Sequence, residues 1–167
     1  MKELFLLAIT GLAAIRDFRS GKIPNLLLAA GMGIACWFWL TEAGAKGVWI
    51  FFTGSTVPLL LLAVLFWFRM IGAGDVKLFC VTGGFLGTQR VLSCMAVSFL
   101  MGAVISLILL IKRRSFKKRL LYFFAYIGRF YQTGEWVPYR NERSREAEFC
   151  FAVPVFFSVL FHIGGIY

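Results

Sequence analysis

Charged side chains are scarce in this chain of 167 residues, where they make up 16% of the sequence, against about a quarter in an ordinary soluble domain. Hydrophobic residues make up 60%, and the mean hydropathy is +0.80. A soluble domain of this length cannot bury so much apolar surface. The composition therefore excludes intrinsic disorder, a collagen-like repeat and a disulfide-rich secreted scaffold, and it predicts an integral membrane protein.

Residues that bind metals are also few. The sequence has one histidine, His162, and its four cysteines form no CxxC pair. The cysteines are Cys36, Cys80, Cys94 and Cys150. All four lie in apolar runs, where a cysteine usually acts as a small buried hydrophobic residue. The pattern argues against a zinc site, and we interpret His162 as structural. We expect neither a metal nor any other cofactor.

Apolar runs predict the fold class. A helix that spans a membrane needs about 20 predominantly apolar residues. Four runs are long enough, namely residues 25–41, 47–68, 91–111 and 149–167. Pro58 predicts a kink in the second of them. Two shorter runs, 4–15 and 76–87, can span only if they include their flanks, which brings Asp17 and Asp75 to membrane boundaries. We predict an all-α integral membrane protein, a single domain over residues 1–167 with a bundle of about six transmembrane helices.

The distribution of lysine and arginine predicts the orientation of these spans. With six spans, 15 of the 18 basic residues fall on one side, and only Lys2, Lys46 and Arg90 fall on the other. Because basic loops stay in the cytoplasm, we predict a multi-pass protein of the plasma (inner) membrane with both termini outside. The net charge of +10 then reflects topology and contact with anionic lipid headgroups, and no nucleic-acid partner is expected.

The largest predicted loop, residues 112–148, lies on the cytoplasmic side and contains ten of the basic residues. Within it, apolar residues recur at helical spacing among lysines and arginines, which predicts a basic amphipathic helix on the inner leaflet. This loop is either a connector anchored to lipid or a surface on which a substrate docks.

Aspartate is the scarcest of the four charged residue types, with only Asp17 and Asp75. Both fall where a short predicted span meets the cytoplasm. A single carboxylate at such a place is usually solvated and paired with a basic neighbour, here Arg16, Arg19 or Lys77. Two carboxylates held near each other can instead share a proton, so that one acts as a base on water and the other as an acid. The pair does not reveal which aspartate has which role.

The residues around each aspartate predict tight turns of the backbone. Gly72 and Gly74 allow close approach of another chain segment, or a positive φ, and they place Asp75 at the start of a helix. There the helix dipole favours an ionised carboxylate, whereas burial favours a neutral one. After Asp17, Pro24 suits the first turn of the next helix, and Asn25 can bond exposed backbone groups there.

Two motifs together resemble the prepilin peptidase family of GxGD intramembrane aspartic endopeptidases. They are Asp17-Phe18-Arg19 with Ile23-Pro24-Asn25, and Gly72-Ala73-Gly74-Asp75 with Val76-Lys77-Leu78. The residues FAVPVF at 151–156 are loosely similar to the family's closing motif, and the resemblance covers about residues 12–160. It implies six membrane helices, with Asp17 and Asp75 as the catalytic residues at the cytoplasmic end of the first helix and the start of the fourth. Gly72, Gly74, Lys77, Pro24 and Asn25 are then supporting motif residues.

The resemblance also implies a substrate. This is a prepilin-like membrane protein with a short leader, cut after a glycine where an apolar helix begins, during pilus biogenesis and protein secretion. Larger bacterial members have a cytoplasmic domain with paired CxxC motifs and N-methyltransferase activity. The sequence does not match those cysteines, so neither zinc nor methylation is carried over to this chain. Its size resembles the short, peptidase-only class associated with tight-adherence (Flp-type) pili.

Two other functions remain open. A non-catalytic membrane subunit or small transporter would use Asp17 and Asp75 as ion or proton sites, although such sites are expected nearer the middle of the membrane. Another GxGD protease, such as a preflagellin peptidase, would share the pair of aspartates. The sequence predicts neither the particular pilin nor the oligomeric state.

Overall fold

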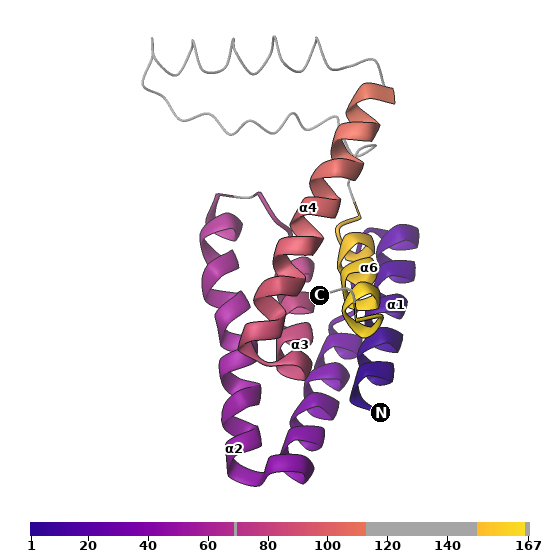
Figure 1. Cartoon of the computed structure of the whole chain (residues 1–167). Coiled ribbons are helices and arrows are strands. Elements are labelled where there is room, and N and C mark those ends of the chain that lie inside the picture. The colour runs from indigo at the N-terminus through magenta and orange to yellow at the C-terminus, as the bar shows by residue number, and fades with distance from the viewer. Residues whose placement is uncertain (69, 113–149, 166–167) are drawn as a thin grey trace. The chain divides into compact units, whose positions relative to one another are not determined.

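The computed structural model describes residues 1–68, 70–112 and 150–165, and every regular element in this part of the chain is a helix. The helices are α1 (Lys2–Ser20), α2 (Asn25–Trp67), α3 (Ala73–Leu86), α4 (Thr88–Lys112) and α6 (Ala152–Ile163) (Figure 1). The predicted all-α class is therefore confirmed. The amphipathic helix predicted within residues 112–148 lies almost wholly outside the described residues.

The chain divides into two compact units. Residues 1–101 and 150–167 form the first, and residues 102–149 form the second. The described part of the second unit is the final stretch of α4, residues 102–112. All residues of the candidate site belong to the first unit, so the description that follows concerns that unit.

Helix α2 is a hairpin of two helical arms. Gly44 breaks the helix with φ 55° and ψ −134°, values that favour glycine, and the chain reverses direction there (Figure 1). Just beyond, Gly47 lies so close to the other arm that an added Cβ would stand 2.0 Å from the Trp39 carbonyl oxygen. The two predicted runs 25–41 and 47–68 thus become the two arms.

The chain break inside α2 lies at Gly44, and the kink at Pro58 remains a prediction. Gly44 has the non-helical backbone angles inside α2, whereas Pro58 continues the second arm. Its ring is buried, and an added Cβ on Gly83 of α3 would stand 3.1 Å from it. Packing against a neighbouring helix lets a proline remain within a helix.

Two of the described helices are long and apolar enough to cross a membrane, Asn25–Trp67 and Thr88–Leu109. This agrees with a membrane protein. The helical stretches follow the order of the six predicted runs, because the two arms of α2 account for two of them. Helices α3 and α6, with 14 and 12 residues, are shorter than a usual span, so the count of six spans remains a prediction.

The short helix α3 lies in the core of the first unit. Most of its residues from Val76 to Leu86 are buried, and it packs against α1, α2 and α6. Glycines permit its closest contact: a Cβ added to Gly83 would stand 2.0 Å from the Gly54 carbonyl oxygen, and one added to Gly54 would stand 2.2 Å from that of Gly83. Small residues at such crossings let helix backbones touch, which fixes α3 against the second arm of α2.

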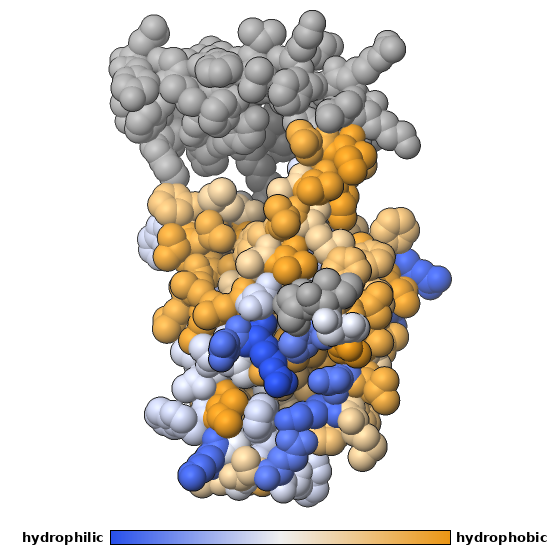
Figure 2. All heavy atoms as spheres, in the orientation of Figure 1, coloured by the Kyte–Doolittle hydropathy of each residue, from blue (hydrophilic) through white to orange (hydrophobic). Residues whose placement is uncertain are grey.

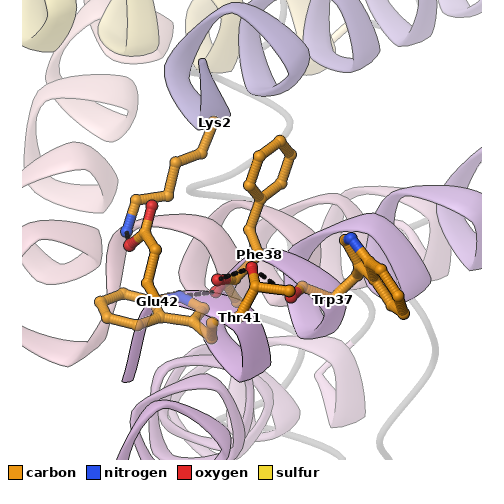
Figure 3. Close-up of polar contacts among 7 residues, drawn as sticks. Lys2, Trp37, Phe38, Thr41 and Glu42 are labelled. Carbon is orange, nitrogen blue, oxygen red and sulfur yellow. Dashed lines mark hydrogen bonds and ion pairs between the residues drawn. The ribbon is translucent and has the colours of Figure 1, made fainter. Parts of the chain in front are cut away.

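Residues predicted to lie on the outer, non-cytoplasmic side of the membrane meet at one end of this unit. Lys2 forms an ion pair with Glu42, close to Thr41 and Phe38 (Figure 3). The Lys2 ammonium also lies 3.8 Å from the centre of the Trp39 ring, and the indole N–H donates to the Gly84 carbonyl oxygen at 2.8 Å. Lys2 and Arg90 line the same small pocket. Hydrophilic side chains gather toward this end (Figure 2), and α1, α2 and α3 are tied together there.

Candidate active site

Asp17 lies in the last turn of α1 and is half-buried. The helix ends because Gly21 takes the left-handed conformation, with φ 61° and ψ 19°, as glycines after a helix often do. The Gly21 N–H donates to the Asp17 carbonyl oxygen at 2.8 Å. The Cys150 thiol, just before α6, donates to the same oxygen over 3.7 Å. The backbone of Asp17 is therefore fixed by contacts from two segments.

Asp75 is the third residue of α3 and is also half-buried. Its carboxylate accepts a hydrogen bond from the N–H of Gly72, the N-cap residue. An acidic residue at the third helical position often reaches back to the N-cap in this way. The contact is close, because a Cβ added to Gly72 would stand 3.2 Å from Asp75 Oδ2. The turn 72–75 thus holds the Asp75 carboxylate from one side, and α3 continues from this turn into the core.

The two carboxyl groups interact electrostatically. Asp75 lies outside the two helices that are long enough to span, ahead of the apolar part of α3. Burial, and then the negative charge of Asp17, raise the pKa of Asp75 from 3.8 to about 6, against the opposing effect of the Gly72 hydrogen bond. Two like charges in a partly dry site cannot both ionise cheaply. The pair therefore retains a proton well above the pH at which a free carboxyl loses it.

The segment between α1 and α2 lies against the second motif. The Ile23 side chain covers Gly74, where an added Cβ would stand 3.6 Å from Ile23 Cδ1. The Lys77 ammonium of α3 donates to Asn25 Oδ1 at 2.9 Å, and Pro24 is the N-cap residue of α2. The structure therefore brings together all seven residues that the sequence motifs single out, although they come from two stretches about 50 residues apart.

Both motifs fall within a region shared with known proteins. Residues 4–107 match the model of the type IV leader peptidase family. The chain belongs to the type IV leader peptidase family. No curated protein and no solved structure matches it. The matched range includes both aspartates and both motifs of the prepilin peptidase resemblance, and the segment 150–165 with α6 lies beyond it.

The structure changes the predicted role of several motif residues. Gly72 has φ −75°, and neither Gly72 nor Gly74 is among the glycines with positive φ. A Cβ would be tight at Gly72, 3.2 Å from Asp75 Oδ2, but at Gly74 it would make only ordinary van der Waals contact with Ile23. The amide oxygen of Asn25 accepts a hydrogen bond from Lys77 of α3, a partner that the sequence did not predict. Lys77 of this leader peptidase family member is thus a link between two segments of the chain.

The contact of Cys150 with the site could not be predicted from the sequence. Its place in an apolar run predicts a small buried hydrophobic residue, but it is half-buried and its thiol points to the backbone of Asp17. A separation of 133 residues leaves no periodic pattern that could reveal the contact. Among the described residues, no group of three or more metal-binding side chains is present.

Proposed function

We propose that this member of the type IV leader peptidase family is an aspartic endopeptidase that removes the leader of type IV-like prepilins. The main support is the electrostatic coupling between Asp17, at the end of α1, and Asp75, at the start of α3. The match to the family model over both motifs adds to it.

The proposed mechanism uses one proton shared between the two carboxyl groups. The ionised carboxylate takes a proton from a water molecule, and the oxygen of that water attacks the carbonyl carbon of the scissile peptide bond. The protonated carboxyl donates its proton to the carbonyl oxygen. Collapse of the tetrahedral intermediate then breaks the C–N bond, and the leaving amine takes up a proton. Either aspartate can serve as the base, because their titration belongs to the pair.

The proposed position of the site is the cytoplasmic boundary of the membrane. The residues predicted to be outside gather around Lys2 and Glu42, whereas the aspartates lie at the other ends of α1 and α3. There, water can reach the carboxylates. A prepilin whose apolar helix begins at the cut would bring its scissile bond to this depth, and anionic lipid headgroups would contact the exposed Arg16, Arg19 and Lys22.

Single substitutions of the aspartates test this proposal. Asp17→Asn and Asp75→Asn should each abolish cleavage of a co-expressed prepilin that has a basic leader, a glycine and then an apolar helix. The readout is the size shift of the prepilin on a gel, with enzyme levels in the membrane measured in parallel. Glu3→Asn, which replaces an exposed carboxyl in the first turn of α1, is the control and should cleave normally. Near-normal cleavage by either aspartate variant would contradict the proposed pair.

A further inference from the structure

The residues just before α6 contact both segments that contain the aspartates. Cys150 donates its thiol hydrogen to the carbonyl oxygen of Asp17. The next residue, Phe151, is the N-cap residue of α6. Its ring packs against Phe79 of α3, with the ring centres 6.0 Å apart, and against Phe99 of α4, with the centres 5.3 Å apart. Two consecutive residues therefore join the end of α1 to the first half of α3.

Phe79 is close to Asp75 in the helix. It is four residues further along α3, so the two side chains lie on the same face, about one turn apart. Phe79 is fully buried, and its ring also stacks on Phe99 at 6.0 Å and an interplanar angle of 17°. The Phe151 ring therefore packs on a residue that lies one helical turn beyond Asp75.

Other contacts hold α6 in the bundle. Further along the helix, the Phe156 ring lies over Gly11 of α1, where an added Cβ would stand 3.2 Å from it. The Ser158 hydroxyl, buried, donates to the Cys94 carbonyl oxygen of α4 at 2.8 Å. Because these contacts are independent of residues 150 and 151, the packing of α6 does not depend on this pair alone.

We propose that Cys150 and Phe151 are positioning residues that set the relative placement of the Asp17 and Asp75 carboxyl groups. The inference rests on the proposed peptidase function. Two carboxyl groups can share a proton only when they lie close together, and a displacement of about 1 Å can lower a catalytic rate roughly 100-fold. Loss of either contact should therefore slow the chemical step and leave substrate binding unchanged.

Paired substitutions test the proposal in purified, full-length enzyme with a prepilin substrate. Cys150→Ala and Phe151→Leu should each lower kcat about tenfold with KM and the thermal midpoint close to wild type. Cys150→Ser retains a donor and Phe151→Tyr retains the ring, so both should keep most of kcat. Cys36→Ala removes another half-buried cysteine, about three turns into α2, and should behave as wild type.

Chemical modification tests the Cys150 thiol in enzyme that has already folded. In a chain with Cys36, Cys80 and Cys94 replaced by alanine, methyl methanethiosulfonate would convert the Cys150 thiol of the folded enzyme to a disulfide without a donor. Activity should fall, and dithiothreitol should restore it. Full activity of enzyme that mass spectrometry shows to be modified would overturn the role of Cys150.

The remaining outcomes separate the positioning role from the proposed function. Unchanged kcat in Cys150→Ala and Phe151→Leu overturns the positioning role, and so does a loss that only follows the folded fraction. If the wild type depends on both aspartates while these variants match it, the proposed function stands and the positioning role alone fails. If the Asp17→Asn or Asp75→Asn enzyme still cleaves, the proposed function fails first.

Discussion

Replacing Asp75 by asparagine should make the protein more stable at neutral pH while it abolishes cleavage. Burial and the Asp17 carboxylate raise the pKa of Asp75 from 3.8 to about 6, so ionisation costs more in the folded chain than in the unfolded chain. The stability that this carboxyl contributes is thus fully present below pH 3.8 and is lost as the pH rises through 6. Asparagine is similar in size, can still accept the Gly72 N–H, and has no charge, so the variant should not show this loss.

The magnitude follows from the change in pKa. About two pKa units correspond to roughly 3 kcal/mol when the group is fully ionised, and about 2 kcal/mol of this is lost between pH 4.5 and pH 7.5. At about 2–4 °C per kcal/mol for a chain of this size, the midpoint difference between Asp75→Asn and wild type should be about 4–8 °C larger at pH 7.5 than at pH 4.5. This is an upper estimate, because water near the half-buried side chain screens the charge.

The assay is thermal unfolding in detergent, followed by tryptophan fluorescence at pH 4.5, 6.0 and 7.5. Asp17→Asn serves as an internal check: it removes the neighbouring charge, lowers the pKa of Asp75, and should reduce the loss of stability with pH. Glu3→Gln removes an exposed carboxyl in the first turn of α1 and controls for the general effect of one fewer acid. A midpoint difference that is negative at pH 7.5, or equal at the three pH values, would refute the reasoning.

Three further predictions concern packing, the link between the motifs, and topology. Gly83→Ala should lower stability by about 1–3 kcal/mol, because its Cβ would stand 2.0 Å from the Gly54 carbonyl oxygen. Gly33→Ala, with nothing within 4 Å of its Cβ, should be neutral or slightly stabilising. Equal thermal midpoints of the two variants would contradict this prediction. Lys77→Met should lower cleavage several-fold by loss of its hydrogen bond to Asn25, while Lys77→Arg keeps a donor and should be mild. A Met variant as active as the Arg variant would contradict the link. In a chain without native cysteines, a cysteine at position 45 should react with an impermeant thiol reagent from outside and one at position 115 should not; labelling of position 115 would contradict the predicted orientation.

The helices could be predicted from the sequence because apolar runs directly record which segments avoid water. The runs 25–41 and 91–111 fall within α2 and α4, and the run 4–15 falls within α1. The ends of the helices could not be predicted in the same way, since residues 16–20 continue α1 although they are mostly polar or charged. Hydropathy cannot detect such an extension, because the last turn of α1 is held by the Gly21 cap.

The pair of aspartates could also be predicted, because both lie in short motifs beside a turn. The contacts that place them could not. Ile23 on Gly74, Lys77 on Asn25 and Cys150 on Asp17 join residues far apart in the sequence, and no periodicity within one helix indicates its partners. The central position of α3 was hidden for the same reason: a run of 12 residues indicates only a helix too short to span, and burial by its neighbours is a tertiary property.

The central position of α3 accounts for how the motif of residues 72–75, at the start of this helix, can hold a carboxylate at a defined place. At its far end, the backbone of Gly83 touches Gly54, and the Gly84 carbonyl oxygen accepts the Trp39 indole N–H. At its near end, Ile23, Asn25 and Phe151 contact the helix within its first two turns. A helix fixed at both ends cannot slide along its axis. The position of Asp75 along the axis of α3 therefore stays the same relative to Asp17. Sites on rigid elements hold reacting groups more closely than sites on loops. We therefore expect substitutions at the far end, although distant from the carboxylates, to affect cleavage through the placement of α3.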